Sequence, residues 1–141
     1  MIKINPYLNF DGNTEEAFNF YKSVFGGEFN QIMHFKDMPA GEQQMPSEEA
    51  KRIMHISLPI GENYLMGSDI SKSMGMKLNQ GNNNYISLSP DTVDDGRELF
   101  NKLSDGGKVE MPFEKMFWGD YFASFTDKFG VMWMVNVSDK K

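Results

Sequence analysis

The sequence predicts an α+β fold made of two βαβββ modules in a single domain of 141 residues. The order strand, helix, strand, strand, strand can be read twice along the chain. Each predicted helix ends at a glycine pair, and each half ends in a hairpin that closes on Ser-Asp; these pairs are Gly26-Gly27, Gly106-Gly107, Ser68-Asp69 and Ser138-Asp139. Because neither half can bury both faces of its own sheet, the two modules are expected to pair.

The first module spans about 1–70. Alternation of apolar and polar residues predicts a strand over 2–10. Asn13, with Glu16 three positions later, is expected to cap a helix whose apolar residues recur at i, i+3 and i+4. Further strands are predicted at 28–35, 52–58 and 64–68. The polar segment 36–49, which contains Pro39, Gly41 and Pro46, is expected to be a loop, and its length is typical of a lid or a solvent-facing excursion.

A polar linker over about 71–84 leads to the second module, about 85–141. A strand at 85–89 precedes a helix that Thr92, together with Asp95, is expected to cap. The remaining strands are predicted at 109–117, 121–126 and 131–137.

The composition excludes several classes of function. The net charge is −6 and the basic residues are scattered, so nucleic acid is a poor candidate partner. No apolar run approaches the roughly 18 residues that a membrane span needs, and the N-terminus lacks a signal-peptide pattern. There is no cysteine for a disulfide, a thiolate zinc site or a nucleophile. A cytoplasmic location is therefore expected, without membrane or nucleic-acid partners.

Strand alternation indicates which side chains face away from the helices. On 52–58, Met54, Ile56 and Leu58 are expected to meet the helix, while Ile53, His55 and Ser57 take the other face. The corresponding residues of three other strands are Asn5, Tyr7 and Asn9; Tyr85, Ser87 and Ser89; Met132, Met134 and Asn136. Two such faces opposed to each other would make a concave, amphipathic small-molecule cleft, and the alternative is ordinary solvated sheet faces.

His55 is the candidate catalytic residue, because imidazole suits acid–base work or a hydrogen bond to an anionic ligand. The alternative is a histidine that only orients a neighbour or fills space. Trp118 could stack on a flat ligand, or it could be buried at a hairpin that Gly119 facilitates. The candidate ligand-binding residues are Asn5, Tyr7, Ser57, Tyr85, Ser87, Trp118, Met134 and Asn136. Asp69 and Asp127, at strand ends, are expected to form turns.

Several segments resemble the PhnB-like branch of the glyoxalase/bleomycin resistance protein/dioxygenase (vicinal oxygen chelate) superfamily. They are Asn5-Pro6-Tyr7-Leu8-Asn9-Phe10, Phe25-Gly26-Gly27, Leu65-Met66-Gly67-Ser68-Asp69, Trp118-Gly119 and Asp127-Lys128-Phe129-Gly130 with Trp133 and Asn136. The resemblance implies two βαβββ modules around one cleft, and a homodimer. Members of the branch have also been labelled demethylubiquinone methyltransferases, but the chain has no glycine-rich strand-to-helix loop for a nucleotide-like cofactor.

The superfamily's metalloenzymes place one ligand on the first strand and one on a late strand of each module. In this sequence those positions look like Asn5 (or Pro6), His55, Tyr85 and Met134. Only His55 is a good ligand for a divalent ion, whereas tight binding takes three or more protein ligands. We therefore expect no metal and no other cofactor.

The function favoured by the sequence is thus metal-independent binding of an unidentified small molecule. A divalent-metal-dependent lyase or dioxygenase that uses His55 is the alternative, so whether the protein is an enzyme stays open. A third possibility is a regulatory or interaction domain whose dimer surface is its function.

Overall fold

A computed structural model of the chain describes residues 2–38 and 45–139. The chain divides into two compact units, unit 1 over Met1–Asn79 and unit 2 over Gln80–Lys141. The division falls within the predicted linker. Among the described residues, no helix is long and apolar enough to cross a membrane.

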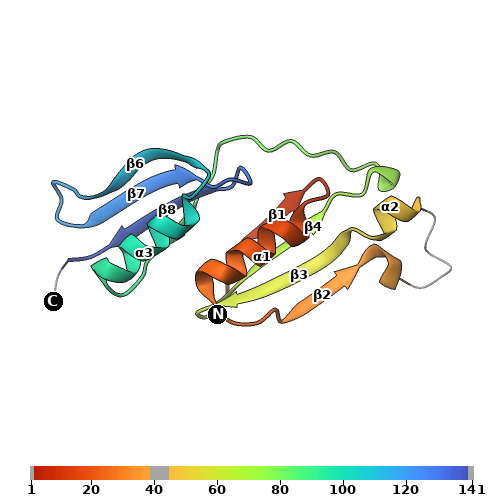
Figure 1. Ribbon diagram of the computed structural model, residues 1–141, viewed down its shortest axis with the longest axis horizontal. Coiled ribbons are helices and arrows are strands. Elements are labelled where there is room, and N and C mark those ends of the chain that lie inside the picture. Colours follow the sequence, from red (N-terminus) through yellow and green to blue (C-terminus); the bar gives the residue numbers. More distant parts are fainter. Residues whose placement is uncertain (1, 39–44, 140–141) are drawn as a thin grey trace. The chain divides into compact units, whose positions relative to one another are not determined.

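Each unit contains one four-stranded sheet with a helix on one face (Figure 1). In unit 1 the elements are β1 (Tyr7–Phe10), α1 (Thr14–Phe25), β2 (Gln31–His34), the 3-10 helix η1 (Phe35–Asp37), α2 (Ser47–Ala50), β3 (Ile53–Ile60), β4 (Asn63–Asp69) and the 3-10 helix η3 (Lys72–Met74). In unit 2 they are β5 (Ile86–Leu88), α3 (Val93–Leu103), β6 (Lys108–Lys115), β7 (Tyr121–Thr126) and β8 (Met132–Val137). The predicted α+β fold of two βαβββ modules is confirmed.

The two sheets have the same topology, β1-β4-β3-β2 and β5-β8-β7-β6. In each sheet the first strand runs parallel to the last one, and the other pairings are antiparallel. Because the first and last strands of a module are neighbours, residues far apart in the sequence meet along one edge of each sheet.

The core of unit 1 lies between α1 and its sheet. Phe18 and Tyr21 on the helix and Ile56 on β3 are completely buried. Gly67 on β4 permits the close approach of the helix, since a Cβ at this position would lie 2.7 Å from Cε1 of Phe18. In unit 2 the helix-facing row of β8 is also buried, and Trp133 is 0% exposed, as predicted for a core residue.

Several local predictions are corrected. Asn13 makes no side-chain capping hydrogen bond at α1, whereas Oγ1 of Thr92 accepts one from Asp95 N at 3.0 Å, as predicted. The first strand covers only Tyr7–Phe10, not the whole of 2–10. The segment predicted as a loop contains η1 and α2. Pro39 and Gly41 lie in the part of this segment, residues 39–44, that is outside the described residues.

The predicted facing of Ile53 and Met54 is also wrong. The pairing of β2 with β3 shifts by one residue, so that Met33 pairs with His55 and His34 with Ile53. This bulge reverses the alternation at the start of β3. Ile53 is therefore buried, at 1% exposure, and Met54 is only half-buried.

Candidate functional site

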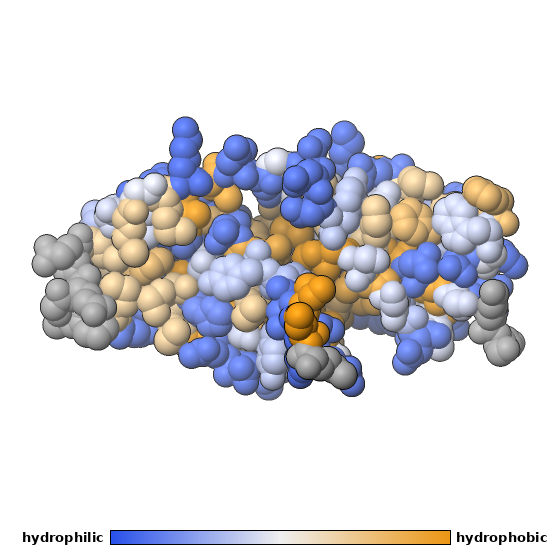
Figure 2. All heavy atoms as spheres, turned by 180° about the vertical axis from the view of Figure 1, so that it is seen from behind, coloured by the Kyte–Doolittle hydropathy of each residue, from blue (hydrophilic) through white to orange (hydrophobic). Residues whose placement is uncertain are grey.

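The outer face of the unit 1 sheet, opposite α1, carries the predicted residues of its strands. The register places Met66 between Tyr7 on β1 and Ser57 on β3. Two residues further along the same strands, Asn9 lies beside Ser68. Seen from the side away from α1, the surface of unit 1 shows hydrophobic residues interspersed with hydrophilic ones (Figure 2). The face is thus amphipathic, as the strand alternation predicts.

Tyr7 and His55 are brought together on this face. The Tyr7 hydroxyl lies 3.3 Å from Nδ1 of His55. The centroids of the two rings are 5.8 Å apart, and the angle between the ring planes is 32°. Strand β4 separates β1 from β3, so the Tyr7 side chain reaches across it. The hydroxyl of Ser68, on β4, lies 3.3 Å from Oδ1 of Asn9.

Asn5 lies outside the strand and has a structural contact. Its Oδ1 accepts a hydrogen bond from Tyr64 N at 2.8 Å, next to a second bond in which Asn63 Nδ2 donates to Ile4 O. These two bonds hold the segment before β1 against the start of β4.

In unit 2 the predicted residue Tyr85 spans its sheet. It precedes β5, at one edge, and its hydroxyl hydrogen-bonds both carboxylate oxygens of Glu110 on β6, at the other edge, at 2.9 and 3.1 Å. The Glu110 carboxylate accepts this bond and raises the pKa of Tyr85 above its ordinary value. Tyr85 alternates with Ile86, which pairs with the buried Trp133, so the Tyr85 side chain lies on the outer face. Its hydrogen bonds place the Glu110 carboxylate on the same face.

The hairpin between β6 and β7 adds Trp118 to the same face. Its ring lies 6.2 Å from that of Phe122, which pairs with Asn136 on β8. Asn136 Nδ2 also lies 3.3 Å from Oδ2 of Asp120. Gly119 supplies the turn with a φ of +104°, as predicted, but Trp118 is 50% exposed, so the alternative of a buried tryptophan is wrong.

The two sheets carry equivalent rows of side chains. Met66 in β4 and Met134 in β8 occupy the same position, each next to the first strand of its module and next to a buried serine of the adjacent strand. The complete rows are Tyr7–Met66–Ser57–Gln31 and Ser87–Met134–Ser124–Met111. His55 is therefore not the counterpart of Met134. His55 lies on β3, two residues before Ser57, which is the β3 member of the unit 1 row.

This donor set does not fit a divalent metal. The equivalent pairs on neighbouring strands are Tyr7 with Met66 and Ser87 with Met134, which offer a phenol, a hydroxyl and two thioethers. Divalent magnesium, manganese and zinc prefer carboxylate or imidazole ligands. Across the described ranges, no group of three or more histidine, aspartate or glutamate residues could hold a metal ion.

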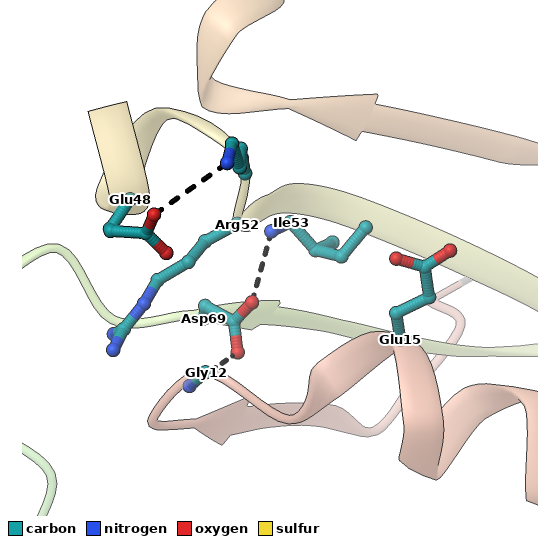
Figure 3. Close-up of a pocket in the computed structure, with 7 residues that line it drawn as sticks. Gly12, Glu15, Glu48, Arg52, Ile53 and Asp69 are labelled. Atoms are coloured by element: carbon teal, nitrogen blue, oxygen red, sulfur yellow. Dashed lines mark hydrogen bonds and ion pairs between the residues drawn. The ribbon is translucent and has the colours of Figure 1, made fainter.

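A separate cavity of about 320 Å³ opens at one end of unit 1. It is lined by Gly12, Glu15, Glu48, Lys51, Arg52, Ile53 and Asp69, and Figure 3 shows these side chains around the start of α1. None of the predicted site residues lines it.

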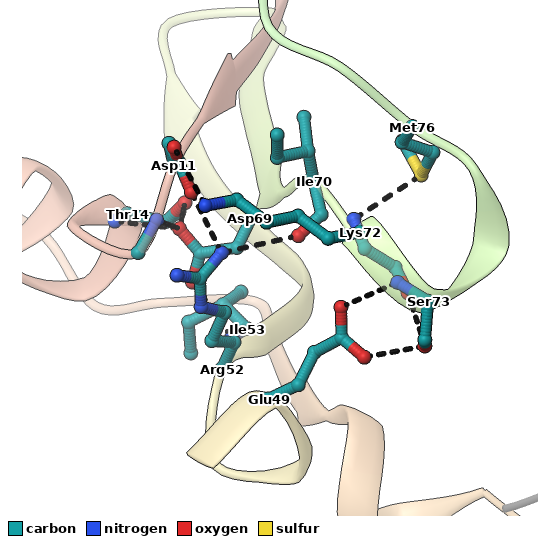
Figure 4. Close-up of polar contacts among 12 residues, drawn as sticks. Asp11, Thr14, Glu49, Arg52, Ile53, Asp69, Ile70, Lys72, Ser73 and Met76 are labelled. Atoms are coloured by element: carbon teal, nitrogen blue, oxygen red, sulfur yellow. Dashed lines mark hydrogen bonds and ion pairs between the residues drawn. The ribbon is translucent and has the colours of Figure 1, made fainter. Parts of the chain in front are cut away.

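Two polar groups of this cavity, Arg52 and Asp69, hold elements of the unit together (Figure 4). Arg52 pairs with Asp11 at 2.9 Å and donates to Ile70 O at 3.4 Å. Asp69 accepts hydrogen bonds from Gly12 N, Thr14 N, Thr14 Oγ1 and Ile53 N. Because these groups already have protein partners, we regard the cavity as a structural junction and place the candidate site on the outer faces.

The predicted turn role is confirmed for Asp127, but it is wrong for Asp69. Asp127 accepts from the nearby amides of Phe129 and Val131, and also from Trp133 Nε1. Asp69 instead binds amides that lie more than 50 residues earlier in the chain.

Met66, Glu110 and Phe122 belong to the outer faces but were not predicted. The alternation used for the other strands would have found Met66, since it applies equally to 64–68. Glu110 lies at a register shift between Val109 and Met111, which alternation does not reveal.

Comparison with known proteins agrees with this architecture. The model of the Glyoxalase/Bleomycin resistance protein/Dioxygenase superfamily matches residues 3–135. Protein YjdN of Escherichia coli is 31% identical over 138 residues, which cover 95% of this chain and 94% of YjdN.

Two solved structures are similar over nearly the whole chain. Protein PA1353 from Pseudomonas aeruginosa is 37% identical with a TM-score of 0.83, covering 98% of each chain. A protein from Bacillus cereus described as PhnB and as a putative 3-demethylubiquinone-9 3-methyltransferase is 24% identical with a TM-score of 0.76, covering 97% of this chain and all of that one, and shows the shared fold. The chain belongs to the glyoxalase/bleomycin resistance protein/dioxygenase superfamily.

Proposed function

We propose that the protein binds a small organic molecule on the outer faces of its sheets, without the divalent metal that many members of the superfamily use. The observation that carries this proposal is the pair of equivalent rows centred on Met66 and Met134. In both units the opposite face of the sheet is buried under a helix, so the outer face is the one available to a ligand.

The chemistry of the faces supports a ligand that is partly apolar. Methionine adapts to irregular apolar shapes, and Trp118 and Phe122 add flat aromatic surface at the end of the unit 2 sheet. A few hydrogen-bonding groups among them, such as the Tyr7–His55 pair, would orient the ligand.

Two further features remain predictions: a cleft between the two modules, and a homodimer. Sedimentation velocity tests whether the protein is a dimer.

A thermal-shift screen of a broad metabolite panel tests the proposal. Any ligand found should lose about 5- to 30-fold in affinity in Met66→Ala or Met134→Ala, since truncating one well-packed contact costs on the order of 1–2 kcal/mol. Met74→Ala is the matched control, because Met74 is 64% exposed on η3 and belongs to neither row. Equal losses in all three variants, or no hit at all, would contradict the proposal, and the second result favours an interaction domain.

Elemental analysis of protein purified without chelators separates the proposal from the metalloenzyme alternative. We expect substoichiometric metal that does not change in His55→Ala. Stoichiometric zinc, nickel or manganese that is lost in this variant would instead favour a metal-dependent lyase or dioxygenase.

A further inference from the structure

Tyr7 and His55 form the one direct hydrogen bond between two side chains of the predicted site within the described residues. Tyr7 is 45% exposed and His55 is half-buried, so the pair lies at the surface of the outer face. The contact involves Nδ1 of the imidazole and leaves Nε2 without a hydrogen-bond partner among residues 2–38 and 45–139. A neutral imidazole carries one N–H, so Nε2 can donate a hydrogen bond only when Nδ1 is the unprotonated nitrogen.

Two arrangements satisfy the 3.3 Å contact: either the Tyr7 hydroxyl donates to Nδ1, or Nδ1–H donates to the hydroxyl oxygen. A phenol O–H is a stronger acid than a neutral imidazole N–H, and an imidazole nitrogen is a stronger base than a phenol oxygen. The first arrangement thus pairs the better donor with the better acceptor. It requires the proton of the neutral ring to be on Nε2.

We infer that Tyr7 is a positioning residue that holds neutral His55 in its Nε2–H tautomer, so that His55 donates a hydrogen bond to an acceptor oxygen of the ligand. This inference deepens the proposed function and rests on it for the ligand. The recognised group is a carboxylate or carbonyl oxygen attached to an apolar or aromatic body.

The charges on the two faces agree with this choice of ligand group. The outer row of unit 1 and its neighbours carry no carboxylate; they are Tyr7, Asn9, Gln31, Met33, His55, Ser57, Met66 and Ser68. The outer face of unit 2, by contrast, carries Glu110 and Asp120. An anionic oxygen would meet no like charge among these described residues, and His55 would attract it more strongly when protonated.

The tautomer can be measured without any ligand, by long-range ¹H–¹⁵N correlation spectra of the full chain with labelled histidine. The chain has only two histidines, so His34→Gln assigns the signals and His34 serves as the internal reference. At a pH where the rings are neutral, we expect Tyr7→Phe to lower the Nε2–H to Nδ1–H ratio of His55 by about 2- to 13-fold, the effect of one net hydrogen bond. The ratio at His34 should not change.

An unchanged ratio in Tyr7→Phe would overturn the positioning role. An increased ratio would overturn it too, since it would show that Nδ1–H donates to Tyr7. Folding should not obscure the result, because the substitution keeps the ring and removes only an exposed hydroxyl.

The ligand group is tested with two probes of the same ring and opposite charge, benzoate and benzylammonium. Benzoate should shift the ring signals of His55 at least about threefold more at equal concentration, and Tyr7→Phe should reduce that shift. An equal or larger response to benzylammonium, or no response to either probe, would overturn the acceptor assignment. Failure of the metabolite screen would instead count against the proposed function, while the tautomer result stands independently of both.

Discussion

Removing the Asp69 carboxylate should destabilise unit 1 more than the loss of an ordinary surface charge. Asp69 is 2% exposed and joins three elements. Its Oδ1 accepts from Gly12 N at 2.8 Å and from Thr14 N and Oγ1 at 3.1 and 2.6 Å, while its Oδ2 accepts from Ile53 N at 2.9 Å. One side chain thus caps the start of α1 and fixes the bulged start of β3.

The magnitude follows from the groups that Asp69→Ala leaves without a partner. Loss of a helix cap costs about 1 kcal/mol. Each further buried donor left unsatisfied costs about 1–3 kcal/mol, although water can reach part of the site once the side chain is removed. We expect a total loss of about 3–5 kcal/mol, a large fraction of the stability of a typical domain. Asp69→Asn should be intermediate, because one acceptor oxygen remains but an amide nitrogen then faces a donor.

Urea denaturation followed by far-UV circular dichroism measures the loss. Both tryptophans, Trp118 and Trp133, lie in unit 2, so tryptophan fluorescence does not report directly on unit 1. Asp105→Ala is the control, since Asp105 is exposed and should change the free energy of unfolding by less than about 0.5 kcal/mol. A loss below about 1 kcal/mol in Asp69→Ala would refute the reasoning.

Two titrating groups give further predictions. Hydrogen bonds from Ser73 lower the pKa of Glu49 below its ordinary 4.5, so its stabilisation is present above pH 4.5 and is lost as the pH falls through the folded-state value. Glu49→Gln should therefore lower stability at pH 7 and reduce its dependence on pH below about 4.5 in urea titrations, and an unchanged acid dependence would contradict this. The stabilisation from Tyr85 depends on pH in the opposite direction. Glu110 raises the pKa of Tyr85 above 10.0, so this stabilisation is present below pH 10.0 and is lost as the pH rises through the folded-state value. In Glu110→Gln, ultraviolet difference titration should show one tyrosine that ionises at lower pH than in the parent protein, and identical titration curves would exclude the contact.

The fold could be predicted because its signals are local. Glycine pairs, helical periodicity and strand alternation each act over a few residues, and the Thr92 cap was found in the same way. The prediction that Asn13 caps α1 was wrong because Asp69 accepts the hydrogen bond from Thr14 N at the start of this helix. Asp69 is distant in the sequence and comes close only through the pairing of β1 with β4. The face of the sheet predicted for Ile53 was wrong because alternation along one strand does not reveal the bulge, which arises from the pairing of β3 with β2. In both cases, tertiary structure overrode a local pattern.

The candidate site could be predicted only in part, for a related reason. Alternation identified Tyr7 and His55 as residues of one face, but not as neighbours, because β4 enters the sheet between their strands. The correspondence of Met66 with Met134 likewise depends on knowing that the last strand of each module lies beside the first.

The equivalent rows also show where the two modules differ. Both keep a methionine in the middle of the sheet and a buried serine beside it, which are Met66 with Ser57 and Met134 with Ser124. The surroundings of these rows are different, because unit 1 carries the Tyr7–His55 pair whereas unit 2 has carboxylates bound to Tyr85 and Asn136. On each face the methionine offers adaptable apolar surface, and the polar groups around it determine which ligand groups that face accepts. The two faces therefore differ in the ligand chemistry that they suit, although their central rows are equivalent.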